Sequence, residues 1–183
     1  MDIDEQLLKE LKKLSGSKTI IVGIGNTLKG DDGAGPLVCE KLKSAGISAE
    51  VIDAGTVPEN YIQPIIKKAP ENLLIIDAMD FGDPPGTIQI FETENLSSSV
   101  VSTHALSPRL FAEVVCRSIK AHPVRNSTNG SEASEKTVSN GVNIYFIGIQ
   151  PEQIGLGQAV SGLVSQAVEQ LCHVLTEIFP PQP

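Results

Sequence analysis

The stretch of sequence that decides the fold is TIIVGIGNTLKGDDGAGP, residues 19–36. It opens with an unbroken, mainly apolar run at 19–22, which ends in two glycines, Gly23 and Gly25. A continuous run of this kind is typical of a strand buried on both faces, as in a parallel sheet. Because proline suits the first turn of a helix, Pro36 marks a helix start. The stretch therefore predicts a strand, a glycine-rich loop and a helix in succession.

Strands and helices alternate along the rest of the chain. Short apolar runs predict strands at 51–52, 73–76 and 144–149, and the alternating run at 87–91 predicts a half-exposed edge strand. Apolar residues three and four apart predict helices whose core-facing residues are Leu7, Leu8, Leu11 and Leu14; Val38 and Leu42; Leu106, Leu110 and Val114; and Val160, Leu163, Val164, Ala167, Val168, Leu171, Leu175 and Ile178. This order predicts an α/β fold, a three-layer sandwich in which a twisted, mostly parallel sheet of about five strands has helices on both faces.

Residues 1–183 are expected to form one domain, with one interruption. Residues 125–141, RNSTNGSEASEKTVSNG, are polar and have no apolar periodicity. Such a composition buries too little apolar surface to offset the entropy of ordering the chain. We therefore predict a flexible insertion there, between a helix and the last strand.

Net charge and cysteine usage limit the classes of partner and compartment. The formal charge is −8, whereas nucleic-acid and anionic-membrane surfaces need clustered Lys and Arg, so neither partner is expected. A partner that is basic or carries a cation fits better. The charged N-terminus lacks the features of a signal peptide, and no apolar run approaches the roughly 20 residues of a membrane span. With three widely spaced cysteines, these features predict a cytoplasmic protein with reduced thiols.

The glycine-rich loop lies where many α/β proteins bind phosphate. A dinucleotide-binding loop needs a third glycine where Leu28 stands, and a P-loop needs Lys followed by Ser or Thr where Asp31 and Asp32 stand. Two carboxylates at that place repel a phosphate. The loop is therefore expected to face a cation or a hydrogen-bond donor, and Asp is also a common helix cap.

Further polar groups are expected at the same edge of the sheet. Asp77 directly follows the predicted strand 73–76, with Asp80 three residues on, and His104 precedes a predicted helix. Carboxyl ends of parallel strands share one edge, where open α/β sheets bind ligands. Each residue also has an ordinary alternative, since a strand-end Asp often caps a loop and a lone His is often only hydrogen-bonded. Together, Asp32, Asp77 and His104 are the best candidates for a metal site, and their ligand types suit zinc or nickel.

Five motifs occur in one order: the loop at 23–36, Pro-Glu-Asn at 58–60, Asp-Ala-Met-Asp at 77–80, Thr-His at 103–104 and Gly-Ile-Gln-Pro at 148–151. This set resembles the hydrogenase maturation endopeptidases, above all the hydrogenase-3 type and its archaeal relatives, including those that serve coenzyme F420-reducing hydrogenases. The resemblance spans most of the chain. The leading helix, the predicted insertion and the Pro-rich tail depart from the family.

The resemblance implies an aspartic-type endopeptidase that removes the C-terminal extension of a NiFe hydrogenase large-subunit precursor. Asp32, Asp77 and His104 map onto the family's metal-contacting residues, which we also take as catalytic. The nickel would be held by the precursor and read as a recognition signal. No tightly bound cofactor is expected to belong to the protease, although zinc or cadmium could occupy the site. The oligomeric state does not follow from the sequence, and a monomer is the default expectation.

Two other classes of function are compatible with the same three residues. One is a self-sufficient metallohydrolase with a permanently bound ion, and the other is a non-catalytic, nickel-dependent chaperone of the precursor. For the endopeptidase, the attacking water could be activated by a carboxylate or by the precursor's metal, and the sequence does not choose between them.

The two adjacent acids of the loop are expected to differ in role. The resemblance places the metal-facing carboxylate at Asp32, which leaves Asp31 to cap the helix that Pro36 opens. Since Asn caps a helix about as well as Asp, Asp31→Asn is expected to cost little stability.

Deleting residues 125–141 and joining the ends with a short Gly-Ser linker should leave the fold intact. Loop-closure free energy changes by only about 0.6 kcal/mol per doubling of loop length. Thermal unfolding followed by circular dichroism measures the effect. A fall of several degrees in Tm would show that the segment packs against the domain.

Overall fold

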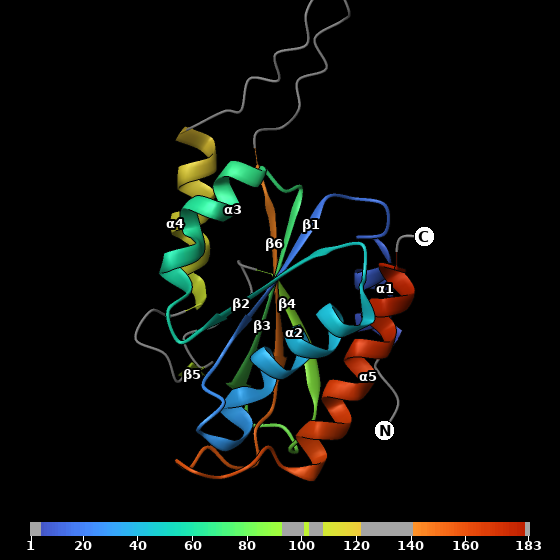
Figure 1. Cartoon of the computed structure of the whole chain (residues 1–183), viewed down its shortest axis with the longest axis vertical. Coiled ribbons are helices and arrows are strands. Elements are labelled where there is room, and N and C mark those ends of the chain that lie inside the picture. The colour runs from blue at the N-terminus through green and yellow to red at the C-terminus, as the bar shows by residue number, and fades with distance from the viewer. Residues whose placement is uncertain (1–4, 93–100, 103–107, 122–140, 182–183) are drawn as a thin grey trace, which may run out of the picture.

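The computed structural model describes residues 5–92, 101–102, 108–121 and 141–181. Five strands form a sheet in the order β2-β1-β3-β6-β4, and the short β5 pairs with β3 (Figure 1). Their bounds are β1 Thr19–Ile24, β2 Glu50–Gly55, β3 Asn72–Asp80, β4 Ile88–Glu92, β5 Val101–Ser102 and β6 Asn143–Ile149. Strands β1, β2, β3 and β6 are parallel, whereas β4 runs antiparallel to β6 at one edge. The predicted mostly parallel sheet of five strands is confirmed.

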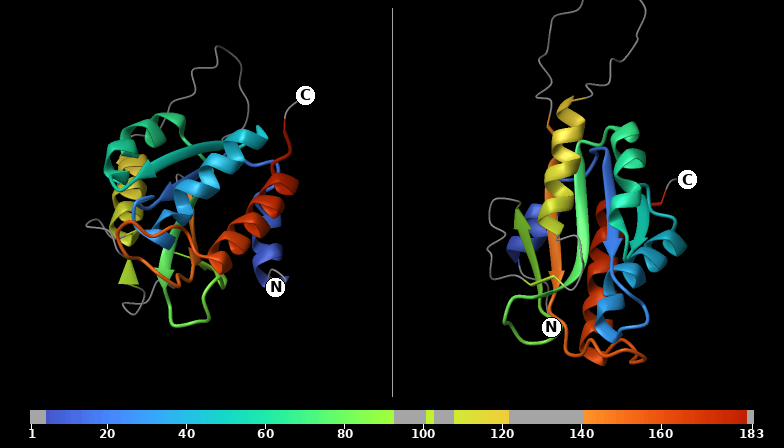
Figure 2. Two further views of the ribbon diagram at one scale, coloured as in Figure 1. Left: turned by 60° about the horizontal axis from the view of Figure 1, so that its bottom comes forward. Right: turned by 90° about the vertical axis from the view of Figure 1, so that its left-hand side faces the viewer.

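Helices cover both faces of this sheet (Figure 2). On one face, α1, α2 and α5 share an apolar cluster with the strands, and on the other face α3 and α4 do so. Two short 3-10 helices, η1 and η2, precede α2 and α3. The bounds are α1 Glu5–Lys12, η1 Gly30–Gly33, α2 Ala34–Ala45, η2 Pro58–Tyr61, α3 Ile62–Lys68, α4 Pro108–Ala121 and α5 Gly162–Ile178. The predicted three-layer α/β arrangement is therefore confirmed.

The burial of each strand follows its sequence pattern. Strand β1 is buried at all six positions and β3 at its first eight, as expected for central strands with helices on both sides. The edge strand β2 alternates between buried and exposed residues. Strand β4 is only partly buried, which agrees with the predicted half-exposed edge.

The predicted stripe of α4 is wrong by one residue. Leu110 is 47% exposed, whereas Phe111, Ala112 and Val115 are buried against the sheet. Leu106 lies outside the described residues. An apolar residue beside the true stripe shifted the predicted face, because three residues define a helical stripe poorly.

Two further elements differ from the sequence prediction. Helix α3 was not predicted, because only Ile65 and Ile66 of its seven residues are buried, and two adjacent residues show no periodicity. In α5, Leu163 is 42% exposed in the first turn, while most of the predicted stripe is buried. Residues 125–140 of the predicted insertion lie outside the described residues.

The cysteines behave as small apolar residues. All three are free thiols; Cys39 and Cys172 are buried, and Cys116 is half-buried. Burial raises the pKa of both the Cys39 and Cys172 thiols to about 12.

Among the helices of the described residues, none has the length and apolarity that a membrane span requires.

Glycines let α2 approach the carboxyl ends of β1 and β3. A Cβ atom added to Gly35 would lie 2.3 Å from the carbonyl oxygen of Ile24 and 2.6 Å from that of Ile76. A Cβ added to Gly23 would lie 2.4 Å from the carbonyl oxygen of Gly35. Because these distances are far below van der Waals contact, only glycine allows this close packing.

Gly35→Ala should therefore destabilise the protein by about 1–3 kcal/mol or more, since backbone atoms of two strands must move to accept the methyl group. Gly162→Ala is the matched control: it lies in the first turn of α5, and its Cβ would meet no atom within 4 Å. Ala there should be neutral or stabilise by up to about 1 kcal/mol. Urea unfolding of both variants measures the difference. Equal stabilities would show that α2 does not need this close approach.

Candidate active site

The loops at the carboxyl edge of the parallel strands carry the predicted site. After β1 the chain forms the glycine-rich loop and η1, and after β6 it forms the loop at 150–161 before α5. In Figure 1 this second loop, in orange, runs at the bottom of the molecule below the start of α2. The edge therefore brings together segments from opposite ends of the chain, as expected for an α/β sheet.

Asp32 lies in η1, and it is 1% exposed. The backbone N–H of Asn26 donates to its Oδ2 at 3.1 Å and to its carbonyl oxygen at 3.0 Å. Gly25, at φ 150°, allows this return of the loop, because a Cβ there would lie on the carbonyl oxygen of Asp32. The glycine-rich loop thus folds back over Asp32 and fixes its backbone.

Asp77 lies inside β3 rather than directly after it, because the strand continues to Asp80. It is fully buried and pairs in register with Gly148 of β6. Alternation along the strand places it on the face of Ile75 and Met79, which is the face that α3 and α4 cover. The prediction of a loop residue was wrong, yet the residue does lie toward the carboxyl end of the strand.

The structure brings the two predicted acids to the same part of the edge. Element η1, which contains Asp32, contacts β3, which contains Asp77. Gly35 lies against the carbonyl of Ile76, the residue before Asp77.

His104, the third predicted member of the site, lies outside the described residues. Within the described part of the chain, no three His, Cys, Asp or Glu side chains form a group that could hold a metal ion.

The sequence predicted that Asp31 caps α2, and this prediction was wrong. Neither η1 nor α2 has a side-chain cap. Instead, the fully buried carboxylate accepts three backbone N–H groups from the loop at 150–161. Oδ2 accepts from Glu152 at 2.8 Å and from Gln153 at 2.9 Å, and Oδ1 accepts from Ser161 at 2.6 Å. Asp31 therefore joins the glycine-rich loop to the loop after β6.

Gln150, whose structural role was not predicted, ties the other side of the edge together. Its side chain is 6% exposed. Its Oε1 accepts the backbone N–H groups of Phe81 and Gly82, and its Nε2 donates to Asp80 Oδ1 at 3.0 Å. It thereby fixes the turn that follows β3. The signal in the sequence was its place in the Gly-Ile-Gln-Pro motif, where an apolar strand ends in an amide side chain.

A pocket of about 430 Å³ opens beside the glycine-rich loop. Its lining residues include Thr27, Gly33, Pro36, Glu40, Asp53 and Val160. Neither Asp32 nor Asp77 lines it. The pocket lies next to the predicted site, and two carboxylates give it acidic character.

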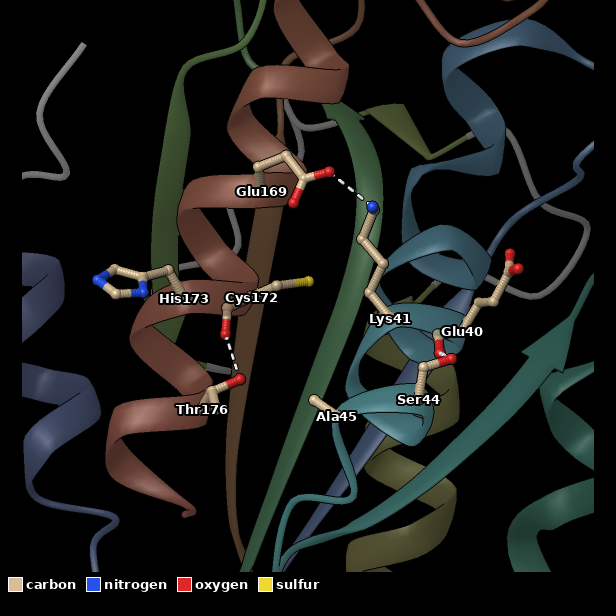
Figure 3. A pocket seen from close by; sticks show the side chains of 8 residues that line it. All are labelled: Glu40, Lys41, Ser44, Ala45, Glu169, Cys172, His173 and Thr176. Carbon is tan, nitrogen blue, oxygen red and sulfur yellow. Dashed lines mark hydrogen bonds and ion pairs between the residues drawn. The ribbon is translucent and has the colours of Figure 1, made fainter. Parts of the chain in front are cut away.

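A second pocket, of about 560 Å³, lies between α2 and α5 and contains no predicted site residue (Figure 3). An ion pair between Lys41 Nζ and Glu169 Oε1, 2.6 Å apart, crosses it. The side chain of His173 is 76% exposed and points away from the pocket in Figure 3. The carboxyl edge thus remains the candidate active site.

Comparison with known proteins agrees with the motifs at this edge. A family model for hydrogenase maturation proteases matches residues 36–178. The chain belongs to the hydrogenase maturation protease family. It is 30% identical over 152 residues to the hydrogenase 3 maturation protease of Escherichia coli K12, and the match covers 82% of this chain and 83% of that protein. The resemblance inferred from the ordered motifs is confirmed.

Archaeal relatives are similar over nearly the whole chain. The coenzyme F420 hydrogenase subunit delta of Methanothermobacter thermautotrophicus is 28% identical, and the match covers 88% of this chain and 94% of that protein. The crystal structure of the NiFe hydrogenase maturation protease HycI of Thermococcus kodakarensis superposes with a TM-score of 0.73 at 30% identity. That superposition covers 92% of this chain and 97% of the other. Family membership makes the protein a peptidase, and therefore a hydrolase.

Asp31→Asn should destabilise this hydrogenase maturation protease, contrary to the sequence-based expectation. The amide keeps one carbonyl oxygen and turns an NH2 group toward backbone donors, which costs roughly 1–3 kcal/mol for each N–H left without an acceptor. Asp53→Asn is the matched control, because Oδ1 of the exposed Asp53 accepts a local N–H from Gly55, and an amide oxygen can accept it equally well. Urea unfolding of both variants measures the cost. If the two variants are equally stable, the three N–H contacts of Asp31 do not stabilise the fold.

Proposed function

We propose that this protein removes the C-terminal extension of a nickel-loaded NiFe hydrogenase large-subunit precursor. The observation that carries the proposal is the burial of two carboxylates, Asp32 and Asp77, on contacting elements at the carboxyl edge of a hydrogenase maturation protease. The names of the relatives, which include a hydrogenase 3 maturation protease, support the choice of substrate. A cytoplasmic location agrees with the composition of the chain.

In this proposal Asp32, Asp77 and His104 contact nickel that the precursor holds. Carboxylate and imidazole groups are suitable ligands for such an ion. The nickel belongs to the substrate, and the protease supplies the ligands that read it. A precursor without nickel offers no cation to the two acids, so its cleavage site is not positioned.

Peptide hydrolysis then needs a base and an acid at the scissile bond. A carboxylate of the pair, acting as in aspartic-type endopeptidases, accepts a proton from the attacking water. The hydroxide oxygen bonds to the carbonyl carbon, the C–N bond breaks, and the proton passes to the leaving amine. Activation of the water by the precursor's nickel is the competing route.

Asp32→Asn and Asp77→Asn should each lower cleavage by roughly 100-fold or more, the usual effect of removing a general base. The assay incubates the purified protease with the large-subunit precursor, with and without nickel, and measures the precursor's C-terminus by mass spectrometry. Glu169→Gln is the control, because it removes a carboxylate from the α2–α5 pocket, away from the edge. It should cleave at the wild-type rate.

Each alternative function has its own outcome in this assay. Nickel-dependent binding of the precursor without cleavage would identify a chaperone. Equimolar zinc that survives dialysis, together with cleavage of simple peptides, would identify a self-sufficient metallohydrolase. Cleavage of nickel-free precursor at the same rate would refute the role of nickel as a recognition signal.

A further inference from the structure

Several large apolar side chains remain exposed at the end of the sheet where the parallel strands finish. In the part of the chain that the structure describes, they all lie in loops or first helical turns at the carboxyl edge of the parallel strands: Leu28, Val57, Leu110, Ile154, Leu156 and Leu163. Single exposed apolar residues are ordinary on a protein surface. The exposed apolar residues on the loops after β1 and β6, at the edge that carries the candidate active site, indicate a binding surface instead.

Three of these residues lie on the two loops that Asp31 joins. Leu28 is 66% exposed, Ile154 is 47% exposed and Leu156 is 78% exposed. The carbonyl of Leu28 accepts the backbone N–H of Gly157 at 2.7 Å. Since Gly157 follows Leu156, this bond brings the backbone at Leu28 close to the backbone at Leu156. We call Leu28, Ile154 and Leu156 the apolar rim.

The apolar rim is held in place before any partner binds. Besides the three N–H groups on its carboxylate, Asp31 donates its own N–H to the carbonyl of Gln153 at 2.8 Å. Gly30 donates to the carbonyl of Gln158 at 3.1 Å. A rigid surface loses little conformational entropy on binding, so its exposed leucines contribute more of their burial free energy to affinity.

Charge restricts which partner can cover this rim. The pocket lined by Glu40 and Asp53 adjoins the rim. Two of its other lining residues are Thr27, next to Leu28 in sequence, and Val160, in the same loop as Leu156. Glu40 and Asp53 line that pocket without a Lys, Arg or His among its lining residues. The chain as a whole carries −8, and this net charge disfavours a second copy or an anionic lipid surface as the partner.

We propose that the apolar rim binds an extended apolar segment, free of acidic side chains, in the polypeptide that the protease cleaves. The proposal rests on the proposed function and specifies how the substrate is held beside the site. The rim contributes binding energy and takes no part in the bond-breaking step. Substitutions there should therefore change KM and leave kcat unchanged.

The test uses Leu28→Ser, Leu156→Ser and the double variant of the full chain. Burial of one leucine side chain corresponds to an affinity change of about tenfold or more, so each single variant should raise KM about tenfold and the double variant more. Because both side chains are exposed, Tm should stay within about 1 °C of wild type. Leu110→Ser is the matched control: its side chain is 47% exposed, as is that of Ile154, but it lies on α4. Its KM should not change.

A binding measurement separates failure of the rim from failure of the proposed function. Fluorescence anisotropy of labelled, nickel-loaded precursor gives Kd for wild type and variants whether or not cleavage occurs. Cleavage by wild type with unchanged Kd and KM in the double variant would overturn the rim alone. Absence of cleavage with a Kd weakened about tenfold would overturn the endopeptidase function and keep the binding surface.

Two further measurements test the chemistry of the occupant. A peptide copy of the precursor's C-terminal extension should bind, and a matched copy with two apolar residues replaced by Asp should bind at least about tenfold more weakly. Sedimentation velocity should show that the chain does not dimerise through the rim, so the double variant should sediment like wild type. Equal binding of the two peptides, or such a dimer, would overturn the proposal.

Discussion

Three backbone N–H groups from Glu152, Gln153 and Ser161 converge on the buried carboxylate of Asp31, and the geometry of the candidate site depends on this contact. The donors lie 121 to 130 residues further along the chain. A carboxylate buried without partners is strongly unfavourable, whereas charge-assisted bonds to N–H groups are about twice as strong as neutral ones. One side chain therefore satisfies three loop amides and fixes the loop after β6 against the loop after β1.

The glycine packing of α2 is the second constraint on the same edge. Gly23 and Gly35 let the helix lie directly on the ends of β1 and β3, and Gly25 lets the loop return over Asp32. Because η1 leads straight into α2, a helix placed further from the sheet would also carry Asp32 away from β3. The glycines of the loop are thus explained by backbone packing, and the phosphate-binding interpretation of the same glycines is not needed. This packing agrees with the exclusion of phosphate on charge.

The α/β fold could be predicted because its central strands are unbroken apolar runs and α5 has a long stripe. Weak patterns failed: α3 has two adjacent buried residues, and three residues misplaced the face of α4. At the site, the order of the motifs singled out Asp32 and Asp77, but the role of Asp31 was not predictable. Its donors are backbone groups of a distant loop, and backbone N–H groups leave no signature in the sequence. Local rules therefore favoured a helix cap, which is the common use of Asp at that place.

The burial of Asp32 and Asp77 bears on how such a site could distinguish a nickel-loaded substrate. Two buried carboxylates on contacting elements suit the binding of a cation, because surroundings that screen charge poorly strengthen the attraction between opposite charges. Under the proposed function, a cation held by the precursor gains this attraction, whereas a nickel-free precursor does not. Recognition is then a difference in binding free energy between the two forms of the substrate. The rigid frame built by Asp31 and the glycines supports that difference, because it fixes the loop that carries Asp32 before the precursor binds.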